Sequence, residues 1–216
     1  RILVRADRML ALDVFTGRRL WERPMPQAAG AGNVGEFVTM EDAIYVAAGR
    51  SCIVLNAATG KEQARFAMPE KILGNLVRLR LWKNSLVGNL GKTVICLDRK
   101  TGDMQWFFEA QRAELSLAVG GNHVYVAELL NARRGETLAK SNTKTFALDI
   151  TSGRQVWQGV GGTDLRYSEP HDLLLTGTAI YKGKDGSVHR KKNTANPSQN
   201  KWNYKSGGLI AGDSLL

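Results

Sequence analysis

One thirteen-residue pattern recurs along this chain and constrains its fold more than any other feature. Residues 10–22 read LALDVFTGRRLWE, and related stretches follow at 53–65, 95–107 and 146–158, with a degenerate copy at 179–191. Their glycines are spaced 43, 42, 51 and 33 residues apart, at Gly17, Gly60, Gly102, Gly153 and Gly186. A polar insertion at 131–144 accounts for the longest spacing. Self-similarity at about 40–45 residues is typical of propeller blades.

A second repeated signal lies between these glycine turns. Apolar residues flank a polar or glycine-containing turn at 37–48, 79–88, 117–127 and 208–216, and more loosely at 165–177. Each stretch predicts a hairpin, because its apolar residues alternate or run in short groups, which does not fit a helix. A β-sandwich has no reason to repeat one turn at a fixed period. We therefore predict an all-β chain that forms a β-propeller of four-stranded antiparallel blades, with about five repeats.

The repeated turn has a mechanical explanation. A residue with a side-chain oxygen stands four positions before each of the first four glycines, where it can accept hydrogen bonds from backbone N–H groups of the turn. These residues are Asp13, Asn56, Asp98 and Asp149. Weaker bonds of the same kind are expected from Thr16, Thr59, Thr101 and Ser152. The glycines are expected to adopt positive φ, which costs glycine nothing sterically.

The tryptophan that closes the pattern is expected to lie between neighbouring blades. It stands four residues after the glycine, at Trp21, Trp106 and Trp157. Each such side chain can bury about 150–250 Å². The second copy has Ala64 at this position and the fifth has Arg190. We predict that these two joints are weaker or are filled from elsewhere.

Written as A-x-D-x-x-T-G-x-x-x-W, the pattern is met in full by Ala11, Asp13, Thr16, Gly17 and Trp21. The copies that end at Trp106 and Trp157 each depart from it by one conservative change. The pattern resembles the tryptophan-docking motif of the quinoprotein alcohol dehydrogenase-like propellers, the PQQ-like repeat family. The resemblance covers essentially the whole chain, and it implies a propeller, which in this family usually has about seven or eight blades.

We interpret residues 1–216 as one partial PQQ-like propeller domain. The chain begins at Arg1 without an initiator methionine or a signal-peptide pattern, and both ends fall inside predicted strands. Either these ends join and close a ring of five blades, or the chain is a segment of a larger 7–8-bladed array. We favour the segment, because a terminus inside a strand leaves an unpaired edge.

The resemblance implies two kinds of function. Some members are periplasmic dehydrogenases that hold pyrroloquinoline quinone (PQQ) and calcium on the axis, usually beneath a disulfide between adjacent cysteines. Others, such as the lipoprotein subunit of the outer-membrane-protein assembly machinery, share the repeats, bind no quinone and serve as protein-binding scaffolds. This sequence has no adjacent cysteines, and none of its carboxylates can be placed on the calcium constellation. We expect no cofactor, and PQQ with calcium only if the chain is a dehydrogenase.

Other catalytic or metal sites find little support in the sequence. GAGNVG at 30–35 matches G-x-G-x-x-G but lacks the following helix that a dinucleotide site needs, so we interpret it as a link between blades. His123, His171 and His189 lack metal-ligand spacing, and we expect the first two to be exposed in turns. The turn aspartates recur once per blade and therefore point apart rather than converge. We assign no catalytic residue and no metal ligand.

The cysteines and the charge fit a globular chain without a disulfide framework. Cys52 and Cys96 are expected on corresponding strands of neighbouring blades, which at about 10 Å are too far apart for a disulfide, so we predict two buried free thiols. The net charge is +10, but only HRKK at 189–192 forms a cluster, which we interpret as a solvated loop face. A polyanion is the weaker alternative partner. No apolar run is long enough for a membrane-spanning helix.

We predict a non-catalytic scaffold that binds a protein, peptide or polysaccharide partner through its loops and axial face. The alternative is a fragment of a PQQ- and calcium-dependent dehydrogenase that oxidises alcohols or sugars. Candidate binding regions are the insertion at 131–144, the basic loop near 184–201, and the places where the repeat breaks, at Ala64 and in the fifth copy. The resemblance implies an extracytoplasmic, periplasmic location. The oligomeric state is not indicated.

Overall fold

The computed structural model describes residues 1–5, 7–26, 36–113, 115–128, 144–160, 165–177, 179–191, 210–211 and 214–215. Throughout these ranges the chain forms strands, turns and irregular segments, and no helix. Accordingly, they include no helix long and apolar enough to cross a membrane. Outside the described residues lie the predicted link at 30–35, residues 131–143 of the insertion and residues 192–201 of the basic loop. The chain divides into two compact units, Arg1–Glu109 and Ala110–Leu216, each described by itself.

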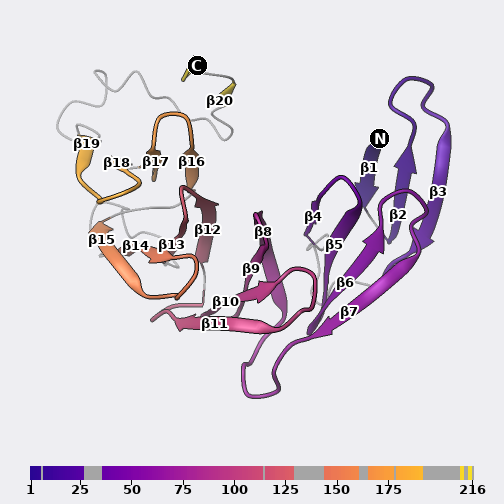
Figure 1. The fold of residues 1–216 in the computed structure, drawn as a ribbon, viewed down its shortest axis with the longest axis horizontal. Helices are drawn as coiled ribbons and strands as arrows, with labels where there is room; N and C mark the ends of the chain where they lie inside the picture. The colour runs from indigo at the N-terminus through magenta and orange to yellow at the C-terminus, as the bar shows by residue number, and fades with distance from the viewer. Residues whose placement is uncertain are drawn as a thin grey trace, which may run out of the picture. The chain divides into compact units, whose positions relative to one another are not determined.

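The first unit contains three antiparallel sheets, which we call blades A, B and C (Figure 1). Blade A consists of β1 (Ile2–Arg5), β2 (Arg8–Leu12) and β3 (Arg19–Pro24). Blade B consists of β4 (Phe37–Thr39), β5 (Ala43–Ala48), β6 (Ser51–Asn56) and β7 (Glu62–Ala67). Blade C consists of β8 (Leu76–Trp82), β9 (Ser85–Leu90), β10 (Thr93–Asp98) and β11 (Met104–Glu109).

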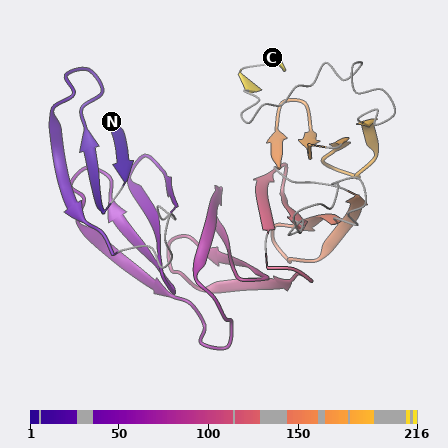
Figure 2. The ribbon, with the colours of Figure 1, turned by 180° about the vertical axis from the view of Figure 1, so that it is seen from behind.

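The second unit contains blades D and E and a short strand pair. Blade D consists of β12 (Leu115–Gly120), β13 (His123–Glu128), β14 (Lys144–Asp149) and β15 (Gln155–Val160). Blade E consists of β16 (Arg166–Ser168), β17 (Leu173–Leu175), β18 (Ala179–Lys182) and β19 (Val188–Lys191). The pair is β20 (Ile210–Ala211) with β21 (Ser214–Leu215). Figure 2 shows these strands from behind.

The strand order confirms the predicted architecture. Blades B to E each contain four antiparallel strands in sequence order, and the predicted hairpins coincide with their first two strands. Hydrophobic cores lie between neighbouring sheets rather than inside a closed layer: one joins blades A and B, another blades B and C, and a third blades D and E. Twisted four-stranded sheets that pack face to face with neighbouring sheets are the construction of a β-propeller.

Each closing hairpin contains a bulge at the same place. The register shifts between Ala11 and Leu12 in blade A, and at the equivalent step in the other blades. As a result each tryptophan lies directly opposite a small residue: Trp21 pairs with Ala11, Trp106 with Cys96 and Trp157 with Ala147. Where the tryptophan is missing, the opposite residue is larger: Val54 faces Ala64, and Ile180 faces Arg190. The small residue of the pattern therefore leaves room for the indole.

The turns have the predicted chemistry. In blade A the Asp13 carboxylate accepts bonds from the backbone N–H groups of Phe15 (3.0 Å) and Thr16 (2.8 Å). Asn56, Asp98 and Asp149 repeat this arrangement. The five pattern glycines all have positive φ: Gly17 68°, Gly60 69°, Gly102 81°, Gly153 70° and Gly186 70°. The degenerate fifth turn keeps its shape with a different side-chain bond, from Ser187 N–H to Asp185.

One local expectation is wrong. His123 was predicted to be exposed in a turn, but it begins strand β13 and is half-buried. Its ring lies 5.9 Å from that of Tyr125, which the D–E core covers completely. His171 is exposed as predicted. The difference arises because the turn is shorter than the sequence suggests, so that strand pairing carries His123 onto the sheet.

Candidate functional site

The joint between blades A and B is closed by Trp21. Its indole lies over Gly60, where a Cβ atom would be only 2.5 Å from Cε3 of the ring. The indole N–H donates to the carbonyl of Ala57 at 3.1 Å. Gly60 therefore has two roles, because its positive φ shapes the turn and its lack of a side chain admits the ring. Trp157 repeats both contacts at the D–E joint, over Gly186 and to the carbonyl of Gly183 at 2.7 Å.

The joint between blades B and C is filled by a different residue. Ala64 is partly buried against the B–C core and is too small to reach across. Phe66, two residues further along β7, is buried instead, and its ring occupies the place of a Cβ on Gly102. The prediction that this joint is filled from elsewhere is confirmed. The position two residues after that of the pattern tryptophan holds Arg23 in blade A and Phe66 in blade B. Blade C has Phe108 there as well as Trp106, so this position alone does not mark the replacement.

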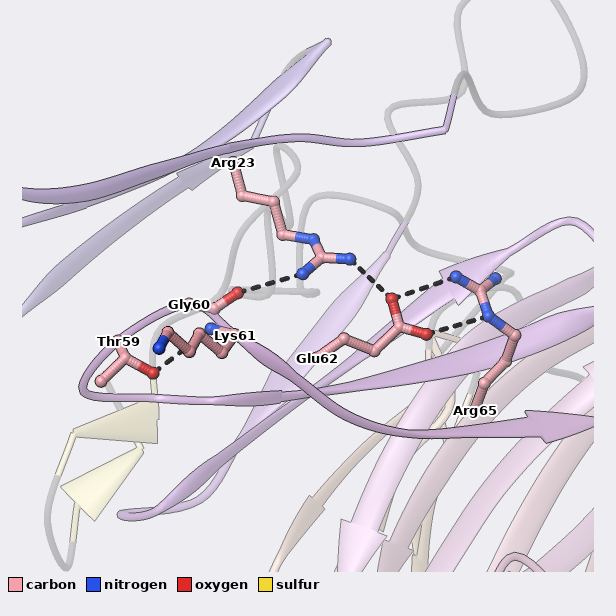
Figure 3. A network of polar contacts seen from close by, with 6 residues as sticks. All are labelled: Arg23, Thr59, Gly60, Lys61, Glu62 and Arg65. Atoms are coloured by element: carbon pink, nitrogen blue, oxygen red, sulfur yellow. Dashed lines mark hydrogen bonds and ion pairs between the residues drawn. The ribbon is translucent and has the colours of Figure 1, made fainter.

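An ion-pair network covers the outer part of the A–B joint. Figure 3 shows Arg23 of β3 and Arg65 of β7 directed at the same carboxylate, that of Glu62. Arg23 Nη2 lies 2.6 Å from Glu62 Oε2, and Arg65 Nε lies 3.0 Å from Glu62 Oε1. Arg23 also donates to the carbonyl of Gly60 at 3.4 Å. Charged residues therefore occupy both outer strands at this joint.

The equivalent positions at the B–C joint are apolar. Arg23 follows Trp21 by two residues and Glu62 follows Gly60 by two; counted in the same way, their counterparts are Phe66 and Met104. Beside Met104 a cavity of about 600 Å³ opens to solvent. Its apolar lining includes Ile72, Leu73, Leu90, Met104 and Phe107. Leu73 is 79% exposed, Phe107 57% and Met104 39%, so three large apolar side chains face solvent here. We call this cavity the B–C groove.

Strand register shows that the B–C groove continues the core of the joint outward. Phe107 pairs with Ile95 and Met104 with Leu97 across the β10–β11 ladder. Paired residues share one face of a sheet. Ile95 and Leu97 belong to the core between blades B and C, so Phe107 and Met104 lie on the face of blade C that is turned to this core. The groove is therefore the outer opening of this joint. Strand β11 forms one of its walls and is an edge strand, paired only with β10 in its sheet.

The opposite wall is the linker between blades B and C, residues 68–75, which is held in place by Arg50. One guanidinium nitrogen of Arg50 donates to the carbonyls of Ile72 (2.7 Å) and Gly74 (3.2 Å), and the other to that of Pro69 (2.7 Å). Gly74 has φ 107° and packs so closely that a Cβ would lie 2.7 Å from the nitrogen of Gly91. These contacts fix the linker, so the groove is preformed.

Three charged residues line the B–C groove. Lys92 and Glu109 form an ion pair of 2.5 Å between Nζ and Oε1, and both side chains are more than half exposed. Lys71 is exposed on the linker. Within the part of the chain that the structure describes, Lys71 forms no ion pair. The groove is therefore an apolar depression with one lysine at its rim, Lys71, that forms no ion pair among the described residues.

The described residues contain no group of three or more His, Cys, Asp or Glu side chains that could hold a metal ion. Cys52 and Cys96 are both buried and form no disulfide, as predicted. Burial raises the pKa of the Cys52 thiol to about 12 and that of Cys96 to about 11, so both stay protonated and unreactive near neutral pH. His189 is exposed on β19. Neither the cysteines nor the histidines form a reactive constellation in these ranges.

The sequence indicates one part of this site and not the rest. Ala64 breaks the repeat, and the B–C groove lies at the joint where it does so. The repeat pattern indicates no role for Leu73, Met104 or Phe107, and none for Arg50. The available signal was the stretch MQWFFE, in which large apolar residues occupy both faces of an outer strand.

Four-stranded blades with cores between them, closed by repeated glycine turns, define a β-propeller built from PQQ-like repeats. A family model described as outer membrane protein assembly factor BamB matches residues 5–169 and, in a second alignment, residues 82–195. The chain belongs to this family. Its resemblance to PQQ-like propellers, inferred from the motif alone, is confirmed.

Solved structures share the fold at low sequence identity. The crystal structure of BamB from Moraxella catarrhalis is 13% identical with a TM-score of 0.55, and the match covers 89% of this chain and 60% of that one. A europium-containing methanol dehydrogenase is 14% identical with a TM-score of 0.56, covering 86% and 48%. The computationally designed Ika8 protein is 15% identical with a TM-score of 0.56, covering 86% and 56%. No curated protein matches the sequence. The chain thus spans 60% or less of the length of these three structures.

Proposed function

We propose that this chain is a non-catalytic propeller scaffold that binds a protein partner, and that the B–C groove is a docking site for it. The observation that carries the proposal is the exposure of Leu73, Met104 and Phe107 around one preformed depression. Clustered exposed apolar side chains in a concave site are typical of interaction surfaces, whereas isolated ones are not. The linker held by Arg50 supports this proposal, because a rigid wall lowers the entropy cost of binding.

We propose further that the chain works without a quinone or calcium and that it is located in an extracytoplasmic compartment, the periplasm. This proposal is supported by the description of the matching family as an outer membrane protein assembly factor. Protease protection in intact cells and after outer-membrane permeabilisation would test the compartment. Protection that persists after permeabilisation but ends on lysis of the inner membrane would contradict a periplasmic location.

Photo-crosslinking tests the docking site directly. A photoreactive phenylalanine analogue at position 107 of the full chain, expressed in its native host, is expected to give a discrete protein adduct. The same analogue at Val156, which is 48% exposed on the outer strand β15, is the matched control. A second substitution, Leu73→Asp, is expected to abolish the adduct at position 107. An adduct that persists in the Leu73→Asp variant, or no adduct at all, would contradict docking in the B–C groove.

A quinone-dependent dehydrogenase is the second candidate, favoured by the structural similarity to a methanol dehydrogenase. The two candidates differ in ligand binding. Titration with PQQ and calcium, followed by absorbance, thermal shift and dye-linked alcohol oxidation, is expected to show neither saturation nor turnover. Saturable quinone binding with turnover would replace the scaffold proposal.

A further inference from the structure

We infer that the B–C groove takes an extended peptide segment, which pairs as an added strand with β11 and places a carboxylate beside Lys71. This inference rests on the proposed function and names the partner chemistry at the same site. Its basis is the combination of an open sheet edge, an apolar wall facing that edge, and a lysine at the rim that forms no ion pair among the described residues.

Strand β11 is an edge strand with little charge to protect it. Outer strands usually protect their edges with charged side chains that discourage pairing with other chains. Strand β3 carries Arg19, Glu22 and Arg23, and β7 carries Glu62 and Arg65, all of them in ion pairs. Strand β11 carries a single charge, Glu109, at its last position. In the first unit, β11 is therefore the outer edge best suited to accept a strand.

The alternation of side chains along a strand matches the position of the B–C groove beside β11. An added strand would lie about 4.8 Å from β11 and point every second side chain to the face that carries Met104 and Phe107. That face looks into the groove, whose far wall presents Leu73. Alternate apolar side chains of the peptide would then fill the space between β11 and the linker. Backbone pairing supplies affinity in this mode, and the side-chain pocket supplies selectivity.

The charges at the rim of the B–C groove favour an acidic group on the peptide. Lys92 is neutralised by Glu109, whereas Lys71 is exposed on the linker and has no ion-pair partner among the described residues. The chain as a whole carries a net charge of +10, which favours the approach of an acidic partner. A carboxylate on the peptide, at the linker end of the groove, complements Lys71.

The probe is a synthetic peptide of about eight residues, a usual strand length, which alternates leucine and threonine and has glutamate at both ends. Binding to the full chain is measured by fluorescence anisotropy at low ionic strength. We expect saturable binding, weakened at least about tenfold when every backbone amide of the peptide is N-methylated. Phe107→Glu is expected to weaken binding by a similar factor, while the matched control Val156→Glu leaves it unchanged.

A charge exchange tests the role of Lys71. The wild-type chain is expected to prefer the glutamate-ended peptide over a lysine-ended one, and Lys71→Glu is expected to reverse this preference. Lys71 is exposed, so this variant keeps its fold, which circular dichroism would verify. If the Lys71→Glu variant keeps the preference of the wild-type chain, the peptide carboxylate does not lie beside Lys71.

The outcomes separate this inference from the proposed function. Absence of saturable binding, or equal binding of the N-methylated peptide, overturns strand addition. If the photo-crosslink at position 107 still forms and depends on Leu73, the docking site stands and its partner is not an extended strand. If the crosslink also fails, the proposed function fails with it.

Discussion

The A–B and B–C joints of the first unit share one plan and present opposite surfaces. Both bury an aromatic ring over a turn glycine of the following blade, Trp21 over Gly60 and Phe66 over Gly102. At the A–B joint the neighbouring outer positions form an ion-pair network, whereas at the B–C joint they leave an apolar groove. The core of a joint and its outer surface are therefore set by different residues.

The difference follows from where the aromatic residue stands on its strand. Trp21 leaves the position two residues later free for Arg23, which reaches Glu62. When phenylalanine takes over the packing from position 66, that position no longer carries a charge. The A–B and B–C joints thus show how one repeat can keep its fold while changing the chemistry of its surface.

The largest expected effect comes from removing either ring. Trp21→Ala and Phe66→Ala should each lower the free energy of unfolding by about 3–5 kcal/mol, because each leaves a cavity in a joint core. Urea denaturation followed by circular dichroism measures both. A loss of less than about 1 kcal/mol for Phe66→Ala would show that Phe66 does not replace the missing tryptophan.

A smaller loss of unfolding free energy is expected when a tryptophan is introduced at the B–C joint. Ala64→Trp should cost about 1–3 kcal/mol, because Phe66 already occupies the surface of Gly102. Adding Phe66→Arg should recover part of this loss and reproduces the tryptophan and arginine of the A–B joint, with Met104 still in the place of Glu62. The double variant is also expected to lose peptide binding. If the double variant binds the peptide as the wild-type chain does and is equally stable, the B–C groove does not depend on the break in the repeat.

The ion-pair network should contribute less. Glu62→Gln is expected to lower the free energy of unfolding by about 0.2–1 kcal/mol, and by less at high salt, because its partners are near the surface. Glu109→Gln at the B–C joint is the matched control, and its more exposed single pair should contribute less still. Urea midpoints at low and high salt measure both variants. Equal losses of unfolding free energy would show that the network stabilises the chain no more than a single exposed ion pair does.

The smallest effect concerns the turns and depends on pH. Hydrogen bonds from the backbone N–H groups of Lys100 and Thr101 lower the pKa of Asp98 in the folded chain. The contribution of Asp98 to the free energy of unfolding is therefore complete above its unfolded-state pKa of about 4, and it is lost as the pH falls through the lower folded-state pKa. Asp98→Asn should therefore reduce acid sensitivity, and Asn56→Asp should introduce it in blade B. Urea midpoints at neutral pH and near pH 3 compare them. Identical acid sensitivity in wild type and both variants would contradict this assignment.

Much of the fold was predictable because its signals are local. The turn capped by Asp13, the positive φ of Gly17 and the strand that ends in Trp21 all arise within one short stretch, and the chain repeats it. Part of the candidate site was predictable too, since Ala64 departs visibly from the pattern. His123 was misplaced because strand pairing, rather than the residues beside it, sets where a turn ends.

By itself the sequence determined the four-stranded blade, its closing turn, the tryptophan side chain between blades and the joint at which the repeat breaks. Only the tertiary structure decided that Phe66 covers Gly102, that Arg50 holds the linker, and that Leu73, Met104 and Phe107 surround one groove. The physical reason is distance along the chain. Turn geometry depends on contacts between near neighbours, whereas a groove depends on which distant surfaces meet and on how completely their side chains fill the space between them.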